Sequence, residues 1–388
     1  MRVLIVLTYY RPHTSGLTIY VERLAGALAQ QGHQVTILTS RYDRRLPSEE
    51  VLDGVRVVRA PVLFRISKGV IMPTFGFLAW RLAREADVIS LHLPQFDAAG
   101  VALRGRLLHK PTVLTYHCDL QLPPGFFNRV VNQVVHWMNR LAAKFAHRIV
   151  AYTQDFADNS PYLCRFSEKL RVIPPPVTLP AAGPSGVAAF AKMHNPAGQH
   201  PVIGMAARFA AEKGVGVLLA AFPQVLERYP GARILYAGQY QDVLGEQAYV
   251  QQLDPLIRRY EQTGQWKFLG VLTPLQMSAF YPNLDVLVVP SLNSTESFGL
   301  VQVEAMLNGV PCVASDLPGV RQPVRMTGMG EIAPVGDAPG LAAAILQVLE
   351  HRGDYARPKD EIAAMFAPEQ TAVAYEQVFA EIGEQYAV

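Results

Sequence analysis

Short runs of apolar residues recur along the chain, separated by polar loops and amphipathic helical patterns. Continuous apolar runs are typical of parallel strands that are covered on both faces. They predict strands at residues 3–7, 35–38, 55–59, 88–91, 112–116, 148–152 and 171–173, and then at 202–206, 233–238, 266–270, 286–289 and 312–314. Strands that alternate with helices indicate an α/β fold with Rossmann-like parallel sheets.

Helical patterns occupy several of the intervening segments. In the first, Val21, Leu24 and Leu28 have the i, i+3, i+7 spacing of one helix face. Further helices are expected at residues 216–228, 273–281, 298–309, 341–349 and 371–386, the last with Pro368 near its start. No G-x-G-x-x-G follows the first strand, so the dinucleotide fingerprint is missing.

The chain has 388 residues, which is long enough for two domains. Three consecutive prolines, at 174–176, open a stretch rich in Pro, Ala and Gly that continues to Pro201. We therefore expect a first domain at 1–176, a linker region at 177–200 and a second domain at 201–367.

The two halves carry opposite charge although the whole chain is only +3. Residues 1–176 hold 22 Lys and Arg against 12 Asp and Glu, a net +10, and the remainder of the chain is −7. This asymmetry suggests that the first half faces an anionic partner. We expect that partner not to be a nucleic acid.

Cysteine usage and the apolar segments bound the location of the protein. Three scattered cysteines fit a reducing compartment and show no metal-ligand spacing: Cys118, Cys164 and Cys312. The chain enters a strand directly after Met1, and the apolar stretch 69–80 is broken by Pro73 and too short to span a bilayer. We expect a cytoplasmic protein, soluble or peripheral on the inner face of the cell membrane.

Residues 126–148 form the most distinctive segment without evident catalytic chemistry. One helical face would carry Val130, Val134, Trp137, Leu141 and Phe145, and another would carry Arg129, Gln133, His136, Arg140, Lys144 and His147. A helix that packs its apolar face on the sheet is slightly favoured. The alternative is a helix that lies on anionic lipid, anchored by Phe126 and Phe127 and joined by residues 63–80.

The longest stretch of candidate chemistry, residues 290–319, reads PSLNSTESFGLVQVEAMLNGVPCVASDLPG. Glu296 precedes the expected helix and Glu304 lies within it, eight residues on and about 12 Å away if helical. The backbone N–H groups of Phe298, Gly299 and Leu300 lie between them and offer an anion site. Two hydroxyl-accepting carboxylates with amide donors between them suit a nucleotide-sugar.

This stretch closely resembles the E-x7-E signature of the retaining glycosyltransferases of GT-B fold, in particular family GT4, the group 1 glycosyltransferases. It follows the family pattern P-S-x(n)-E-x-F-G-x-x-x-x-E-A-x-x-x-G-x-P-x-x-A-S-x-x-P-G almost without gaps. The resemblance covers nearly the whole chain and is weakest at 41–110 and 177–200. It implies two Rossmann-like domains that face each other across a cleft, with a C-terminal helix, 368–388, that crosses back to the first domain.

The resemblance also assigns roles to residues of the second half. Arg208 and Lys213 match the R-x4-K-G pair that clamps the donor diphosphate, where two fixed cations stabilise the departing phosphate. Glu304 would accept from the ribose hydroxyls, and Glu296 would accept from the sugar hydroxyls. Gly238 is counted among the substrate-binding positions as a strand–glycine turn, and Val271 as part of the turn that holds the nucleobase.

In the first half, His117 follows a strand and is similar to the family histidine that points at the donor sugar. Asp119 is a weaker candidate for the acceptor. Ser15 and Gly16 stand where the family usually has Gly-Gly near the donor phosphates and the acceptor, and Ser15 departs from that pattern. The alternatives are that His117 is a structural histidine and that Ser15-Gly16 is a plain turn.

The implied activity is retaining transfer of a hexose from a UDP- or GDP-sugar to an acceptor hydroxyl, with a lipid, a lipid-linked glycan or another glycan as acceptor. No carboxylate is obviously placed as a nucleophile. No Asp-x-Asp motif is present, so we expect no metal and no cofactor, with Arg208 and Lys213 in the place of a divalent ion. Two other readings remain open: a sugar-nucleotide epimerase of GT-B fold, and a non-catalytic membrane-bound partner subunit.

Overall fold

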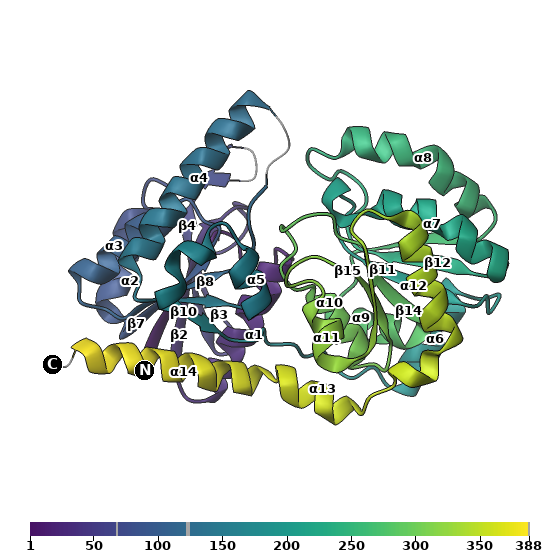
Figure 1. The fold of residues 1–388 in the computed structure, drawn as a ribbon. Coiled ribbons are helices and arrows are strands. Elements are labelled where there is room, and N and C mark those ends of the chain that lie inside the picture. The colour runs from purple at the N-terminus through teal and green to yellow at the C-terminus, as the bar shows by residue number, and fades with distance from the viewer. Residues whose placement is uncertain (67–68, 122–124, 387–388) are drawn as a thin grey trace. The chain divides into compact units, whose positions relative to one another are not determined.

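The computed structural model describes residues 1–66, 69–121 and 125–386. The chain divides into two compact units (Figure 1). Unit 1 contains Met1–Pro176 together with Phe366–Val388, and unit 2 contains Val177–Met365. Each unit has its own sheet and hydrophobic core. Among the described residues, no helix is long and apolar enough to cross a membrane.

Unit 1 is built on an eight-stranded sheet with the order β10-β9-β8-β7-β1-β2-β4-β3. Its strands are β1 (Arg2–Val6), β2 (Gln34–Arg41), β3 (Glu49–Leu52), β4 (Val55–Pro61), β7 (Val88–Leu93), β8 (Thr112–Tyr116), β9 (Arg148–Ala151) and β10 (Leu170–Val172). All pairs are parallel except β3 with β4. A separate hairpin joins β5 (Phe64–Ile66) to β6 (Gly69–Ile71).

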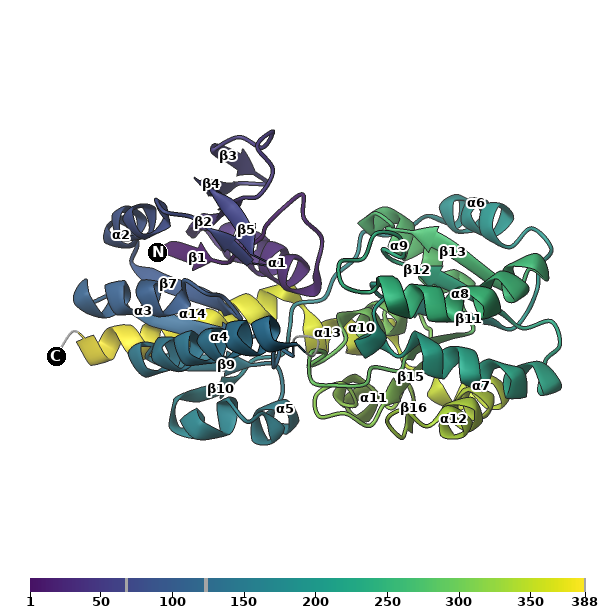
Figure 2. The ribbon, with the colours of Figure 1, turned by 90° about the horizontal axis from the view of Figure 1, so that it is seen from above.

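The helices of unit 1 are α1 (Gly16–Gln30), α2 (Phe75–Glu85), α3 (Ala98–Leu107), α4 (Phe126–Phe145), α5 (Gln154–Asn159), the 3₁₀ segment η1 (Leu163–Lys169) and α14 (Pro368–Tyr386). Helix α14 comes from the other end of the chain and packs on α1 (Figures 1 and 2). The Tyr375 hydroxyl lies 2.8 Å from that of Tyr20 and 2.6 Å from Thr115 Oγ1. The predicted return of the last helix to the first domain is confirmed.

Unit 2 has a six-stranded parallel sheet with the order β13-β12-β11-β14-β15-β16. Its strands are β11 (Val202–Ala206), β12 (Arg233–Ala237), β13 (Trp266–Gly270), β14 (Val286–Val289), β15 (Cys312–Ser315) and β16 (Gly330–Ala333). Its helices are α6 (Pro184–His194), α7 (Val215–Arg228), α8 (Gln247–Gln262), α9 (Pro274–Phe280), α10 (Leu300–Met306), α11 (Gln322–Thr327), α12 (Ala338–Glu350) and α13 (Lys359–Phe366). Short 3₁₀ segments are η2 (Ala211–Lys213), η3 (Tyr281–Asn283) and η4 (Arg352–Tyr355).

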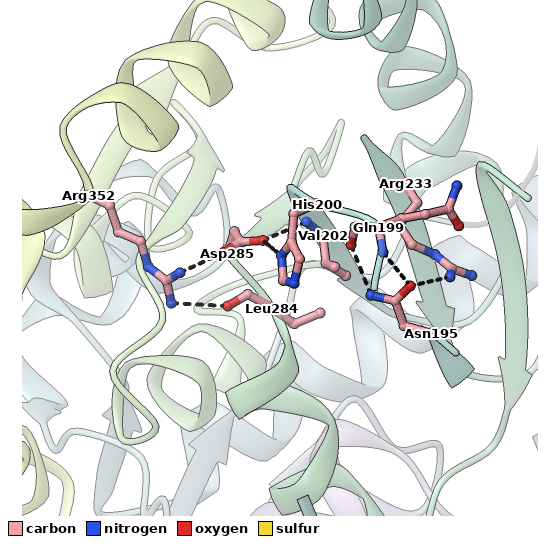
Figure 3. A network of polar contacts seen from close by, with 8 residues as sticks. All are labelled: Asn195, Gln199, His200, Val202, Arg233, Leu284, Asp285 and Arg352. Carbon is pink, nitrogen blue, oxygen red and sulfur yellow. Dashed lines mark hydrogen bonds and ion pairs between the residues drawn. The ribbon is translucent and has the colours of Figure 1, made fainter. Parts of the chain in front are cut away.

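A network of hydrogen bonds and ion pairs connects residues at the amino ends of three strands of unit 2 (Figure 3). Asp285, just before β14, accepts hydrogen bonds from Val202 N at 2.7 Å, His200 Nδ1 at 2.9 Å and Arg352 Nη1 at 2.6 Å. Asn195 Oδ1 accepts from Arg233 Nη1 at 2.7 Å, at the start of β12. These bonds satisfy polar groups at the amino ends of β11, β12 and β14. Loops that carry function are expected at the opposite edge of the sheet, where the strands end.

The order in which strands are added changes direction once in each sheet. In unit 1, β2 and β4 follow on one side of β1, and the later strands from β7 onward lie on the other side of β1. In unit 2 the reversal lies between β11 and β14. In open parallel sheets, ligands bind outside the carboxyl ends of the strands at such a switch point. The loops after β1 and β7, and those after β11 and β14, are therefore where binding chemistry is expected.

Two segments differ from the sequence prediction. The helix expected at 298–309 spans only Leu300–Met306, because Gly299 has φ +79° and Gly309 has φ +74°, which places both glycines in the left-handed region. The 177–200 segment contains helix α6, which buries Phe190 against Phe280. It is therefore an extended linker over only part of its length.

Candidate functional site

Two loops of unit 2 meet at its switch point. One follows β11 and contains Arg208 and Lys213, and the other follows β14 and contains Glu296. Leu292 N donates to Glu212 O at 2.9 Å. Gly214, with φ +74°, lies so close to the second loop that a Cβ there would stand 1.9 Å from the carbonyl oxygen of Pro290. The glycine of the R-x4-K-G segment thus has a packing role, since it lets the two loops touch.

Lys213 and Glu296 form the centre of this loop pair. Lys213 Nζ lies 2.7 Å from Glu296 Oε2, and Gly299 N donates to Glu296 Oε1 at 3.0 Å. One carboxylate is thus held by an ammonium group and a backbone amide, which is the donor set that a phosphate oxygen prefers. The Gly299 amide, predicted to be free for an anion, donates instead to Glu296 in this structure.

Arg208, the second predicted cation, lies on the same loop. Its Nη2 is 2.6 Å from Glu212 Oε1, and its side chain is 38% exposed. Both predicted diphosphate ligands are therefore paired with carboxylates of unit 2. Because the Arg208 pair is partly solvent-exposed, it is weakly held and open to exchange with a stronger anion.

Glu304 projects from α10 and is 5% exposed. Its Oε2 accepts a hydrogen bond from the Tyr281 hydroxyl at 2.7 Å. Helix α10 begins at Leu300, so only four of the eight residue steps from Glu296 to Glu304 lie within the helix, and the expected helical rise of about 12 Å does not apply. Buried and oriented by a tyrosine, Glu304 is a fixed acceptor for hydroxyl groups.

The two predicted positions on the far side of β11 have different characters. Gly238 has φ +132°, and a Cβ there would stand 2.0 Å from the carbonyl oxygen of Ala207, so the packing of β11 against β12 already requires glycine. Val271 follows the edge strand β13, and its side chain is 62% exposed.

In unit 1, His117 follows β8 and is 6% exposed. Its Nε2 lies 2.9 Å from His92 Nδ1, and its Nδ1 is hydrogen-bonded to the Tyr152 hydroxyl. Burial, and then the neighbouring His92, lower the pKa of His117 well below its ordinary value, and burial lowers the pKa of His92 to about 3. Both imidazoles are therefore neutral near pH 7, with one N–H shared between them.

Aromatic rings and the C-terminal helix surround His117. The Tyr20 ring lies edge-on to His117 with centroids 5.0 Å apart and stacks on Tyr152 at 5.2 Å. The Tyr20 hydroxyl bonds Tyr375 of α14. Asp119, two residues beyond His117, accepts from the Tyr116 hydroxyl at 2.9 Å and from Ser160 Oγ at 2.7 Å. Asp119 is thus bound into the fold of unit 1.

Ser15 and Gly16 lie at the amino end of α1. Ser15 is the N-cap, and its hydroxyl accepts from Thr18 N at 3.2 Å. Gly16 lacks a positive φ, and a Cβ placed on it would meet no atom within 4 Å. Serine at position 15 therefore has a local structural reason, whereas the fold of unit 1 does not itself require glycine at position 16.

Both units match families of known proteins. Residues 188–364 match the family described as "Glycosyl transferases group 1", and residues 14–179 match "Glycosyltransferase Family 4". The chain belongs to the group 1 (GT4) glycosyltransferases. It is therefore a retaining hexosyltransferase that uses a nucleotide-sugar donor.

Its relatives among the group 1 glycosyltransferases are distant. It is 27% identical over 361 residues to a phosphatidyl-myo-inositol mannosyltransferase of Mycolicibacterium smegmatis, covering 90% of this chain and 85% of that enzyme. It is 28% identical over 381 residues to a glycogen synthase of Mycobacterium tuberculosis, covering 90% and 86%.

Solved structures show the GT-B fold. Anabaena HepE, in complex with UDP and glucose, superposes with a TM-score of 0.78 at 20% identity and covers 98% of this chain and 100% of HepE. The sucrose-phosphate synthase of Thermosynechococcus elongatus gives 0.76 at 22% identity and covers 99% of each chain.

Within this group 1 glycosyltransferase, unit 2 brings Lys213, Glu296 and Gly299 together. Arg208 lies on the same loop as Lys213, whereas Gly238 and Val271 follow strands on the other side of β11. Several side chains that contact the predicted site residues were not predicted from the sequence, among them Tyr281, Glu212, His92, Tyr152 and Tyr20. The sequence offers a signal only for His92, a polar residue directly after the apolar run 88–91 and within β7.

Proposed function

We propose that the protein transfers a hexose from a UDP- or GDP-sugar to a hydroxyl of a lipid or lipid-linked glycan at a membrane surface. The observation that carries this proposal is the carboxylate of Glu296, held by Lys213 and the Gly299 amide at the switch point of unit 2. A site that binds a carboxylate through a cation and a backbone N–H also suits a phosphate.

In the proposed complex, the donor diphosphate takes the place of carboxylates. Lys213 exchanges Glu296 for a phosphate oxygen, and Arg208 exchanges Glu212 in the same way. Glu296 then accepts hydrogen bonds from the sugar, while Glu304, oriented by Tyr281, accepts from the ribose. Phe298, Gly299 and Leu300 supply amides, and the turns at Gly238 and Val271 lie toward the nucleobase.

The proposed reaction forms one bond and breaks one bond at the same sugar carbon. The acceptor oxygen attacks C1 on the face from which the phosphate leaves, and the acceptor proton passes to the departing phosphate oxygen. Lys213 and Arg208 stabilise the negative charge that grows on that phosphate. His117, neutral at pH 7, contacts the sugar by exchanging its bond to Tyr152, and no metal or cofactor takes part.

A lipid surface as the place of reaction is supported by α4. The sequence slightly favoured a helix whose apolar face packs on the sheet, but three residues of that face are exposed: Val130 by 47%, Val134 by 42% and Trp137 by 63%. The buried positions among residues 129–148 are instead Asn139, Ala142, Ala143, Ala146 and His147. The side chains of Phe126 and Phe127, the predicted anchors, lie outside the described part of the structure.

Charge supports the same surface. Helix α4 carries Arg129, Arg140 and Lys144 and no acidic residue. It packs on α3, which has two arginines and no acid, and α3 packs on α2, where Phe77 is 70% exposed. A surface that is apolar and basic at once suits an anionic lipid headgroup region. The name of the mycolicibacterial relative also fits a lipid acceptor.

The direct test is a thermal-shift screen with UDP-, GDP- and ADP-sugars, followed by detection of transfer. We expect Glu304→Ala to weaken binding of every nucleotide, and Glu296→Ala chiefly to reduce transfer. Normal binding and turnover by both variants would contradict the assigned roles.

A further inference from the structure

A chain of hydrogen bonds in unit 1 leads from Ser90 through two histidines to Tyr152. Ser90 Oγ lies 3.3 Å from His92 Nε2, and His92 Nδ1 lies 2.9 Å from His117 Nε2. The chain continues from His117 Nδ1 to the Tyr152 hydroxyl. Ser90 and His92 are two positions apart on β7, so they share one face of the sheet. They are 1% and 0% exposed, so any effect that they have on a substrate passes through His117.

The protons of the two histidines are coupled because both imidazoles are neutral. Burial lowers the pKa of His92 to about 3, and burial together with His92 lowers the pKa of His117 well below its ordinary value. A neutral ring has one N–H, which donates, and one bare nitrogen, which accepts. Two arrangements are therefore possible. Either both rings are protonated on Nδ1 and donate toward Tyr152, or both are protonated on Nε2 and donate toward Ser90.

Ser90 distinguishes between the two arrangements. In the part of the chain that the structure describes, His92 Nε2 is the one hydrogen-bond partner of the Ser90 side chain. If the rings donate toward Tyr152, the Ser90 hydroxyl donates to His92 and its hydrogen is satisfied. If they donate toward Ser90, the hydroxyl hydrogen is buried without an acceptor among the described residues, which is unfavourable. The geometry therefore favours protonation of both rings on Nδ1.

Aromatic packing holds the two imidazoles in this geometry. The centroid of the Tyr20 ring lies 5.9 Å from that of His92 and 5.0 Å from that of His117, and the same ring stacks on Tyr152 at 5.2 Å. The Tyr20 hydroxyl is itself bonded to Tyr375 of α14. Rings packed in this way have little freedom to turn, so each nitrogen keeps its partner.

We infer that His92 is a positioning residue: by donating its Nδ1–H to His117 Nε2, it makes His117 present an N–H, on Nδ1, to a hydroxyl oxygen of the donor sugar. This inference rests on the proposed transferase function and specifies how one residue of its site is oriented. Positive charge grows on the sugar ring as the phosphate leaves. A neutral N–H binds a sugar oxygen at that stage without the repulsion that an imidazolium would add.

The first test is ¹⁵N NMR of the full-length protein, labelled at its histidines and measured at pH 7 without ligand. Protonated and bare ring nitrogens have well-separated ¹⁵N shifts, and the spectrum of His117→Asn identifies the His117 signals. We expect His117 of the wild type to be protonated on Nδ1, which is the minor form of a free histidine side chain. Protonation of His117 on Nε2 would overturn the inference.

The second test is His92→Phe, which removes the N–H but keeps a ring. His117 Nε2 then lacks its partner in either form, so the Nε2-protonated form should gain population. With UDP-glucose and GDP-mannose as donor probes, we expect kcat for donor hydrolysis to fall about tenfold, while the Kd of the nucleoside diphosphate stays unchanged. His92→Asn, whose amide can donate in place of Nδ1, should restore the Nδ1-protonated form and most of the rate.

His33→Phe is the matched control. His33 lies just before β2, at the amino edge of the same sheet, and its side chain is 11% exposed and bonded to Glu376. It should leave the protonation of His117 and kcat as in the wild type, even if the melting temperature falls. An equal loss of kcat in His33→Phe and His92→Phe, or wild-type protonation and rate in His92→Phe, would overturn the inference. Hydrolysis of neither donor by the wild type would count against the proposed function, whereas the NMR result still decides the protonation of His117.

Discussion

At the scale of single residues, Glu296 has a double role. It neutralises Lys213 in the protein alone, with 2.7 Å between the two charged groups, and it also satisfies the Gly299 amide. The lysine and the carboxylate are 18% and 25% exposed, so the pair loses part of its hydration. Removing Glu296 from Lys213 without a replacement would leave a partly buried charge unpaired, which is unfavourable. A donor phosphate that takes the place of Glu296 keeps the Lys213 charge paired.

The hydrogen bond from the Tyr281 hydroxyl to Glu304 can be removed by a single substitution. Tyr281→Phe deletes a 2.7 Å hydrogen bond to a buried carboxylate, which typically contributes about 1.5–3 kcal/mol. We expect the Kd of the nucleotide to rise by about tenfold, measured by isothermal titration calorimetry, because Glu304 loses its fixed orientation. Tyr355→Phe removes a similar bond, to Glu331 at 2.5 Å, and should leave the Kd unchanged. Equal Kd values in both variants would refute the role of Tyr281.

The carboxyl group of Asp97 should make the free energy of unfolding depend on pH. Burial raises the pKa of this half-buried carboxyl to about 6, and Arg104 opposes the shift only in part. The native state therefore keeps a proton that the unfolded chain releases, so stability falls as the pH rises from about 4 to about 6, by up to about 3 kcal/mol. Asp97→Asn should match the wild type at pH 4 and exceed it at pH 7 in urea unfolding.

Asp87 provides a control of opposite sign. A side-chain hydrogen bond from Arg2 lowers the pKa of Asp87, so its contribution is present at pH 7 and is lost as the pH falls. Asp87→Asn should therefore be less stable than the wild type at pH 7. A stability difference between Asp97→Asn and the wild type that does not vary with pH would contradict the argument.

At the scale of elements, Gly214 joins the loop after β11 to the loop after β14. Gly214→Ala places a Cβ 1.9 Å from the carbonyl oxygen of Pro290 in a left-handed conformation. We expect it to lower the free energy of unfolding by more than about 2 kcal/mol and to weaken nucleotide binding, because Lys213 moves away from Glu296. Gly186→Ala in α6, where a Cβ meets nothing within 4 Å, should be neutral or slightly stabilising. Urea unfolding of both variants distinguishes the outcomes.

Helix α4 makes a prediction about membranes. Replacing Arg129, Arg140 and Lys144 with glutamine removes three positive charges, each of which contributes about 1 kcal/mol at an anionic surface. The affinity for phosphatidylglycerol vesicles, measured by co-sedimentation, should then fall by about a hundredfold. The same replacement at Arg228, Arg258 and Arg259 of unit 2 should have little effect. No binding of the wild type at low salt, or equal loss in both variants, would exclude the membrane proposal.

Elements differed in how well their sequence predicted them. Most strands of both sheets were predicted because buried parallel strands are apolar throughout, and β8, β11, β13 and β14 have the predicted bounds, whereas the antiparallel edge strand β3, with the sequence EEVL, was missed. Strand β16, with the sequence GEIA, is too short and too polar to show this signal. For α4, periodicity identified an apolar face but could not tell that α3 and the sheet would cover a different face.

At the scale of the whole molecule, the sequence pointed to candidate site residues only where those residues belong to short contiguous motifs. Arg208, Lys213, Glu296 and Glu304 belong to two short motifs, and those motifs meet because β11 and β14 are neighbours in the sheet. Tyr281 precedes Glu304 by 23 positions, so no local sequence pattern links the two residues. Partners that the fold supplies from a distance can be recognised only in three dimensions.

In the proposed function, the paired loops of unit 2 bind a nucleoside diphosphate through Lys213. Isothermal titration calorimetry of UDP and GDP against the wild type and Lys213→Met examines this contact without an acceptor. We expect a measurable Kd for one of the two nucleotides and an increase of about tenfold or more in the variant. Equal affinity of both proteins for that nucleotide, or no binding of either nucleotide to the wild type, would refute the role of Lys213 and of the paired loops.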